Sequence, residues 1–255
     1  MYSFNSLQVD LKNEVSKING QVALKVKFLN SDETFEYNAY AQVWAASVIK
    51  IPLVCTVYKQ INEKQIYDQE RHIIKQENRV DGSGIAKLFS TSTEFTIHDL
   101  IVMTLTISDN SATNELIDIV GVGATETYMH KLGLVNTTLR HKMMVKAGKG
   151  PNLTTATDIT TLLEKLYKKV IPGKDEVLNF MKHTRLRDRL PRKIPNTVEV
   201  ANKPGSLPEA MHDVGVVFSA NPFIFSFLSD DQKDKEITRE VISNCAKSCF
   251  DYSNQ

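Results

Sequence analysis

Residues 45–52 read Ala-Ala-Ser-Val-Ile-Lys-Ile-Pro and open an apolar stretch that continues to Ile61. The stretch is mostly compatible with a helix. Pro52 favours a helix that starts at or just before it, because proline is tolerated in the first helical turn. Ser47 and Lys50 are three residues apart there and therefore share one face. A serine hydroxyl becomes a nucleophile when a base takes its proton, and a lysine with a lowered pKa can be that base. The spacing alone occurs by chance in many proteins.

A second polar motif, Ser108-Asp109-Asn110, separates two stretches whose hydrophobic spacing predicts helices, at 96–106 and 111–120. A side chain at such a junction can point into a cleft. In isolation the motif is equally typical of an ordinary helix cap, because Ser, Asp and Asn are favoured capping residues.

A third motif, Lys203-Pro204-Gly205-Ser206, follows a predicted strand at 198–203. By itself it is typical of a strand that ends in a Pro-Gly turn. Three such motifs in this order and at these separations are much harder to attribute to chance than any one of them.

Hydrophobic spacing predicts helices and strands at both ends of the chain and helices alone in the middle. Residues 7–18 have helical spacing, and Val22, Leu24, Val26 and Phe28 alternate as in a strand. We expect the strands of both ends to join one antiparallel sheet flanked by helices, with an all-helical subdomain packed beside it. The expected division is 1–42 and 186–255 for the subdomain that holds the sheet and 43–185 for the helical subdomain, with the active site between them.

The composition is that of an ordinary globular chain with a net charge of +1 from 31 basic and 30 acidic residues. Such a balance does not favour nucleic acid as a partner. We expect no metal or other cofactor, no membrane partner, and a monomer that acts on a small molecule. Cys55, Cys245 and Cys249 are expected to be free thiols. Residues 1–20 have no apolar signal segment, so we expect a cytoplasmic protein; the alternative is an exported protein that has already been trimmed.

The three motifs together resemble those of the penicillin-recognising serine hydrolases, and most closely the class A β-lactamases of the β-lactamase/DD-peptidase superfamily, whose motifs are S-x-x-K, S-D-N and K-T-G. The resemblance covers nearly the whole chain. Further stretches that carry it are Gly82-Ser83-Gly84-Ile85, the extended motif from Ser108 to Asn114, Lys131-Leu132-Gly133 and Thr138-Leu139. It implies an α/β (α+β) fold of the β-lactamase/transpeptidase type.

The resemblance also implies a role for each residue of the three motifs. Ser47 would attack the carbonyl, Lys50 would take or relay its proton, and Ser108 would pass a proton to the leaving nitrogen. The backbone N–H groups of Ser47 and Ser206 would form the oxyanion hole. Lys50 and Lys203 would lower each other's pKa. The substrate would be bound by Asn110, Lys203, Gly205 and Ser206.

The sequence departs from the class A pattern at two places. Pro204 stands where threonine is usual, which is tolerable where the missing N–H is not needed by the sheet. The loop at 140–152, which should carry a glutamate that activates the deacylating water, has no Asp or Glu. Asn152 and His141 are the possible loop residues, although an amide cannot act as a base. We therefore expect a β-lactam to acylate Ser47 and to leave slowly.

Three functions are compatible with these residues. The first is a serine hydrolase of class A β-lactamase type. The second is a D-alanyl-D-alanine carboxypeptidase, or a related amidase or esterase, that uses the same acyl-enzyme. The third is a catalytically silent binding protein, and the presence of Ser47, Lys50, Ser108 and Lys203 argues against it.

Overall fold

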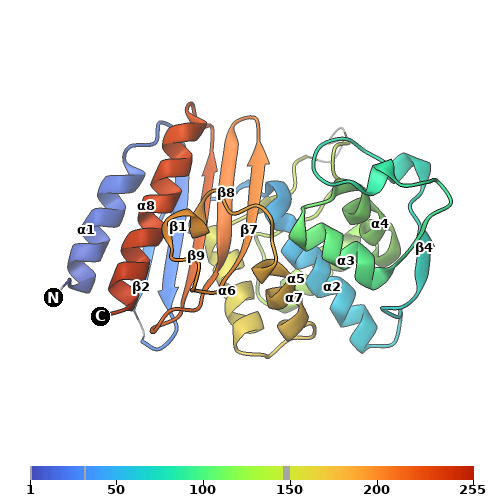
Figure 1. Cartoon of the computed structure of the whole chain (residues 1–255), viewed down its shortest axis with the longest axis horizontal. Coiled ribbons are helices and arrows are strands. Elements are labelled where there is room, and N and C mark those ends of the chain that lie inside the picture. The colour runs from blue at the N-terminus through green and yellow to red at the C-terminus, as the bar shows by residue number, and fades with distance from the viewer. Residues whose placement is uncertain (1, 32, 146–149) are drawn as a thin grey trace.

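A five-stranded antiparallel sheet in the order β2-β1-β9-β8-β7 joins the two ends of the chain (Figure 1). The structure is a computed structural model that describes residues 2–31, 33–145 and 150–255. Full-length pairing of β1 with β9 confirms that N- and C-terminal strands share one sheet. The strands are β1 (Gln21–Phe28), β2 (Thr34–Tyr37), β7 (Val200–Leu207), β8 (Ala210–Val217) and β9 (Phe223–Asp230).

Helices α1 (Phe4–Val15) and α8 (Lys235–Ser253) lie side by side on one face of this sheet (Figure 1). The four alternating residues of β1 all belong to the core beneath them, as the period of two predicts. Leu7 and Leu11 of α1 meet them there because they lie four residues apart on one helical face. Burial of each such side chain is worth about 1.5–3 kcal/mol.

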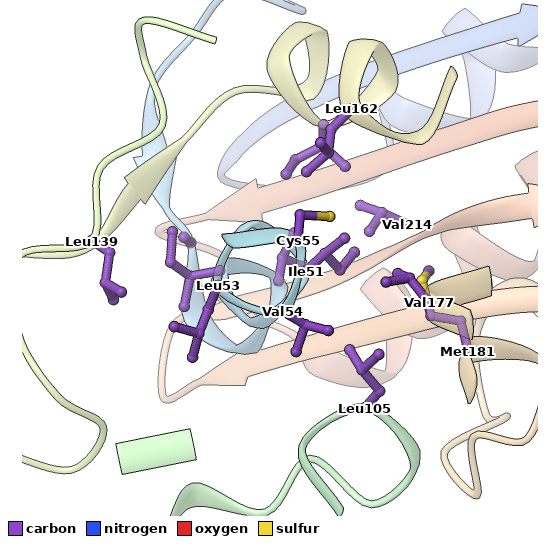
Figure 2. Packing of buried hydrophobic residues seen from close by; sticks show 14 of the residues in the cluster. Ile51, Leu53, Val54, Cys55, Leu105, Leu139, Leu162, Val177, Met181 and Val214 are labelled. Atoms are coloured by element: carbon purple, nitrogen blue, oxygen red, sulfur yellow. The ribbon is translucent and has the colours of Figure 1, made fainter. Parts of the chain in front are cut away.

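Helix α2 (Lys50–Asn62) runs through the centre of a second core, which lies between the opposite face of the sheet and the helical region (Figure 2). Its first two turns are buried all round and, apart from Lys50 and Thr56, apolar, as is typical of a central rather than an amphipathic helix. Figure 2 shows Leu105, Leu162 and Val214 around it, which come from three different elements. The helices that pack there are α3 (Ile97–Thr106), α4 (Asn110–Val120), α5 (Val122–Lys131), α6 (Ala156–Tyr167) and α7 (Lys174–Lys182).

The remaining elements are short. They are β3 (Val43–Trp44) paired with β6 (Leu153–Thr154), β4 (Arg71–Ile73) paired with β5 (Glu94–Thr96), and the 3-10 helices η1 (Ala46–Ile49), η2 (Gln76–Asn78), η3 (Ala86–Leu88) and η4 (Leu190–Lys193). Among the described residues, no helix combines the length and the apolar character that crossing a membrane requires.

The prediction that the strand at 198–203 ends at Lys203 is wrong, because β7 continues through Pro204 to Leu207. Proline is accepted inside this strand because β7 is the edge of the sheet and pairs only with β8. The motif is therefore held in a strand rather than in a turn. The observed antiparallel sheet flanked by helices confirms the predicted fold class. The middle of the chain is mostly helical, but the expectation of helices alone there is wrong, because the short strands β3, β4, β5 and β6 form two small sheets in it. The division into subdomains at residues 42 and 185 stays a prediction.

Candidate active site

Ser47 lies in the short turn η1 between β3 and α2. Ala46, directly before it, has a φ of 44°. A non-glycine residue in this left-handed region is strained, and such strain persists where the surroundings hold it. Here the amide of Ala45 donates to the carbonyl of Asn152 at 2.8 Å. The turn is also pressed against β7, because a Cβ at Gly205 would lie 3.2 Å from the amide nitrogen of Ser47.

Lys50 is completely buried at the first turn of α2. Its Nζ donates to the carbonyl of Ser108 at 2.7 Å, to Oδ1 of Asn110 at 2.8 Å and to Oγ of Ser108 at 3.1 Å. Burial lowers the pKa of Lys50 well below its usual value, the positive charge of Lys203 lowers it further, and Asp109 opposes both. Burial and the charge of Lys203 therefore both favour the neutral form of this amine, the form that a base requires.

Ser108 sits at the break between α3 and α4, with a φ of 57° that turns the chain sharply. Its Oγ accepts from Nζ of Lys50 at 3.1 Å and from Nζ of Lys203 at 2.9 Å. The three sequence motifs thus meet at one hydroxyl, which bridges two buried amines.

Lys203 is completely buried in β7, where its Nζ also donates to the carbonyl of Pro204 at 3.0 Å. Burial lowers the pKa of Lys203 to about 7; Asp213 opposes this shift and the positive charge of Arg189 adds to it. The repulsion between the two amines lowers the pKa of Lys50, and because such repulsion is mutual it also disfavours the charged form of Lys203.

The S-D-N junction is fixed by the loop at 80–86. The carboxylate of Asp109 accepts from the amides of Ile85 at 2.6 Å and Ala86 at 2.7 Å, and caps α4 at the amide of Ala112. Gly84 is required here, because a Cβ would lie 2.1 Å from that carboxylate and the φ is +100°. The loop thereby holds the junction that carries Ser108 in place.

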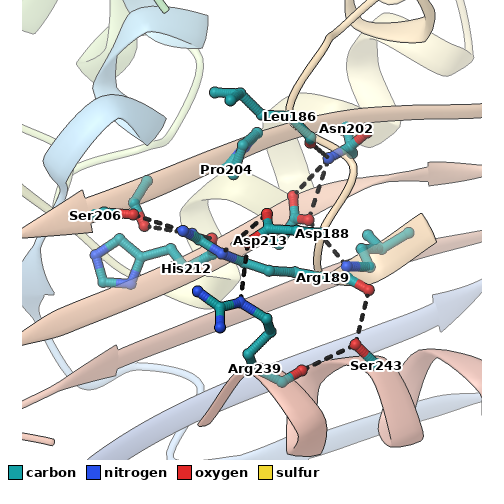
Figure 3. Close-up of polar contacts among 12 residues, drawn as sticks. Leu186, Asp188, Arg189, Asn202, Pro204, Ser206, His212, Asp213, Arg239 and Ser243 are labelled. Atoms are coloured by element: carbon teal, nitrogen blue, oxygen red, sulfur yellow. Dashed lines mark hydrogen bonds and ion pairs between the residues drawn. The ribbon is translucent and has the colours of Figure 1, made fainter. Parts of the chain in front are cut away.

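Arg189, which the sequence did not single out, completes the site at the outer end of β7 (Figure 3). Arg189 is only 7% exposed. Its guanidinium donates to the carbonyls of Gly205 at 2.8 Å and His212 at 2.7 Å, and to Oγ of Ser206 at 2.6 Å. It reaches β7 from the segment just before η4. Nothing in the sequence shows that this segment crosses the β7–β8 hairpin, so no local signal could have identified Arg189.

Ser47 opens onto two cavities. One, of about 290 Å³, is the more polar of the two, and its lining includes Ser47, Ser108, Ser206 and the arginines of the segment 185–189. The other, of about 450 Å³, lies between Ser47 and the loop and is lined largely by apolar side chains. Those apolar residues are Trp44, Ala46, Met143, Met144, Val145, Pro151 and Leu207. A substrate bonded to Ser47 could place one side in each cavity.

Asn152 and His141, the two loop residues that the sequence indicated, both line the apolar cavity, but their side chains have different hydrogen-bond partners. The side chain of Asn152 is taken up by the loop itself, since its Oδ1 accepts from the amides of Arg140 at 2.7 Å and His141 at 3.2 Å. Nδ1 of His141 contacts the carbonyl of Lys142 at 2.7 Å and must donate there, which leaves Nε2 as an acceptor. Both residues line the cavity that contains Ser47.

Met143 is a second residue that the sequence did not single out. Asn114 accepts from its amide at 2.6 Å and donates to its carbonyl at 3.2 Å, so helix α4 holds the loop at this point. Met143 is 8% exposed and lines the same cavity as Ser47 and Asn110. An apolar thioether therefore occupies the wall of the loop that faces the nucleophile. Lys146, Ala147, Gly148 and Lys149 of the predicted loop lie outside the described residues.

No cluster of three or more His, Cys, Asp or Glu side chains that could hold a metal ion occurs among residues 2–31, 33–145 and 150–255.

Comparison with known proteins shows which proteins have a similar sequence and fold. The beta-lactamase VEB-1 of Pseudomonas aeruginosa is 22% identical over 97% of this chain and 90% of its own length. A beta-lactamase from Sphaerobacter thermophilus has the same fold, with a TM-score of 0.91, 23% identity and 98% of each chain covered. The structure of PBP-A, with a TM-score of 0.90, 22% identity and coverage of 98% of this chain and 96% of its own, is similar as well, and a variant of it was solved as an acyl-enzyme complex with penicillin G.

A family model described as the beta-lactamase enzyme family matches residues 6–253, which is nearly the whole chain. The chain therefore belongs to the beta-lactamase enzyme family, and its fold is that of β-lactamases and penicillin-binding proteins.

Proposed function

We propose that this protein opens β-lactams through an acyl-enzyme on Ser47 and that the acyl group leaves slowly. The observation that carries the first part is the hydroxyl of Ser108, which bridges the two buried amines of Lys50 and Lys203 beside the cavities that Ser47 lines. A buried lysine is expensive unless its amine is hydrogen-bonded and its charge can be lost. Two of them at one hydroxyl favour a proton-transfer site over a silent binding site.

In acylation, Lys50 would take the proton of the Ser47 hydroxyl while Oγ attacks the carbonyl carbon of the lactam. A neutral amine can accept that proton, and its lowered pKa favours the neutral form. When the C–N bond of the lactam breaks, Ser108 would deliver its hydroxyl proton to the leaving nitrogen and recover a proton from the protonated lysine. The contact of Lys50 with Oγ of Ser108 at 3.1 Å is the route for that return.

The developing oxyanion would be bound by the backbone N–H groups of Ser47 and Ser206. Support comes from the close approach of η1 to β7 at Gly205, which brings the two chain segments together. Lys203 and Ser206 would hold the carboxylate of the substrate in the polar cavity, and Asn110 would bind its amide. Asn110 is suited to this because it already fixes Lys50 through Oδ1.

Slow deacylation is proposed because the wall of the loop that faces Ser47 offers no carboxylate among the described residues, and residues 127–157 contain neither Asp nor Glu. Met143 cannot activate water. The amide of Asn152 is bonded within the loop and cannot act as a base. His141, whose Nε2 is left as an acceptor, is the remaining candidate base.

A second candidate function is a peptidase, amidase or esterase of the same acyl-enzyme type, for example a D-alanyl-D-alanine carboxypeptidase. The lack of a carboxylate in the described part of the loop favours it, since such a loop is compatible with an enzyme that deacylates well only with its natural substrate. The similarity to PBP-A supports it too, as far as the fold is concerned.

Labelling with a fluorescent penicillin, followed by intact mass over time, separates the candidates. The proposed enzyme gives a Ser47-bound adduct that persists, an efficient β-lactamase gives one that is rapidly released, and a silent binding protein gives none. Ser47→Ala must abolish the label, whereas Ser90→Ala, which removes an exposed hydroxyl outside both cavities, must leave it unchanged. Release of D-alanine from an acyl-D-alanyl-D-alanine peptide, compared with turnover of penicillin, decides for the peptidase.

A further inference from the structure

We infer that His212 is a positioning residue that fixes the turn carrying Ser47 against the edge of the sheet. The inference rests on the proposed function, because it assigns to this buried ring an effect on the acylation of Ser47. His212 does not line either cavity at Ser47, so its effect would pass through the backbone.

The ring of His212 joins two segments that are far apart in the sequence. Its Nε2 contacts the carbonyl of Trp44 at 2.7 Å, and its Nδ1 contacts the amide nitrogen of Ser229 at 3.1 Å. A backbone amide can only donate and a carbonyl can only accept, so Nδ1 is the acceptor and Nε2 carries the hydrogen. One neutral tautomer satisfies both partners.

The ring occupies a place where the regular strand pairing stops. The ladder between β8 and β9 runs from Val217↔Phe223 to Asp213↔Phe227, and His212 is the next residue of β8. Beyond that point side chains make the connections, since the hydroxyl of Ser229 donates to the carbonyl of Met211 at 2.6 Å and its amide donates to the His212 ring. The imidazole thus replaces a backbone carbonyl and extends the bonding from β9 to Trp44 of β3.

The position of the ring relates it directly to the nucleophile. A Cβ at Gly205 would lie 3.1 Å from Cδ2 of His212 and 3.2 Å from the amide nitrogen of Ser47. The ring and the Ser47 amide therefore both contact Gly205, and Trp44 precedes Ser47 by a single short segment. A shift of the ring would change the separation of the Ser47 and Ser206 amides that form the proposed oxyanion hole. Hydrogen bonds of that kind require donors within a few tenths of an ångström.

Three substitutions separate the two hydrogen bonds of the ring from its volume. In His212→Gln the side-chain NH₂ lies near the position of Nε2 and can donate to Trp44. In His212→Asn the side-chain oxygen lies near Nδ1 and can accept from Ser229 but cannot reach Trp44. His212→Phe fills the space and makes neither bond. The matched control is Ser226→Ala. It removes a buried hydrogen bond of 2.9 Å between the hydroxyls of Thr160 and Ser226, and neither residue lines the two cavities.

We expect His212→Asn and His212→Phe to lower the acylation rate constant by about tenfold or more, because misplacement of a reacting group by about 1 Å can reduce a rate about a hundredfold. His212→Gln should remain within about threefold of the parent protein, on the same scale of geometric effects. Ser226→Ala should lower the Tm without changing acylation. Two results would overturn the inference. One is an equal loss of acylation rate in His212→Gln and His212→Phe. The other is a loss of acylation rate in Ser226→Ala that matches the loss in a His212 variant of the same Tm.

Amide hydrogen exchange of the peptide that covers residues 43–49 tests the same inference without reference to activity. Exchange should become faster in His212→Asn and His212→Phe and stay unchanged in His212→Gln and Ser226→Ala. If the parent protein does not react with penicillin, the proposed function fails while this pattern still decides whether His212 holds the turn. If the parent reacts and the exchange pattern is absent, the positioning role alone is wrong.

Discussion

The side-chain amine of Lys203 lies 2.9 Å from the hydroxyl of Ser108, although β7 and the α3–α4 junction are far apart in the sequence. Lys50 reaches the same hydroxyl from α2. This contact between sheet and helices joins the three polar motifs at one hydroxyl, which is the centre of the proposed proton route.

Removal of the bridging hydroxyl should impair acylation more than binding. We expect Ser108→Ala to lower the acylation rate constant by about two to four orders of magnitude, the usual contribution of a positioned acid or base. Stopped-flow measurement with a chromogenic cephalosporin gives the rate constant separately from the affinity. Thr106→Val is the control, because its hydroxyl only bonds back to the carbonyl of Val102 at 2.7 Å. An unchanged rate in Ser108→Ala would remove this serine from the proton route.

The contribution of Lys203 to the stability of the protein should rise with pH between about 7 and 10.5. The pKa of Lys203 is lowered to about 7 in the folded protein, so in this interval the unfolded chain binds the proton and the folded protein does not. Folding is then favoured by about 1.4 kcal/mol for each pH unit gained. Urea unfolding across this interval should show a slope that is smaller in Lys203→Met than in the parent protein by up to about 1.4 kcal/mol per pH unit, because Lys50 and the buried cysteines titrate in both proteins. Equal slopes in the two proteins would contradict the lowered pKa.

A carboxylate in the loop wall should speed the release of the acyl group. Met143 faces the cavity of Ser47 and its backbone is held by Asn114, so Met143→Glu would place a base there without moving the loop. We expect the deacylation rate constant to increase by at least about tenfold, a modest fraction of what a general base contributes. Intact mass of the penicillin adduct over time measures it. Met143→Gln is the matched control, since an amide of the same size cannot activate water. Equal release in both variants would show that Met143 does not face the deacylating water.

The apolar cavity should favour substrates with an apolar acyl side chain. Trp44, Met143 and Leu207 are among the residues that line it. Benzylpenicillin and its 6-acetamido analogue differ only in a phenyl ring, whose partial burial is worth about 1.5 kcal/mol. We therefore expect acylation efficiency to be about tenfold higher for benzylpenicillin. Met144→Ala should reduce this ratio, because it removes part of the wall. A ratio near one in the parent protein would place the acyl side chain elsewhere.

Much of the fold follows from patterns that the sequence states directly. The period of two in β1 and the helical spacing of Leu7 and Leu11 predicted the elements and the faces they bury, because burial of apolar side chains decides both. The strand at Lys203 was expected to be shorter, since proline usually ends a strand. Only the sheet order shows that β7 is an edge, where the missing N–H is not needed.

Ser47, Lys50, Ser108 and Lys203 were also indicated by the sequence, because each belongs to a short motif whose residue types match the chemistry. The sequence could not supply Arg189, His212 and Met143. Each acts through a contact between segments that are distant along the chain: Arg189 with Ser206, His212 with Trp44, and Met143 with Asn114. Local patterns carry no information about such contacts.

The sequence by itself thus determined which side chains could do acyl-transfer chemistry and in which order they occur. The tertiary structure decided their protonation. A lysine in water is charged at neutral pH, and complete burial beside another cation lowers the pKa of Lys50, which favours the neutral amine that a base requires. Desolvation and charge proximity depend on the whole fold, and for that physical reason no local sequence could specify them.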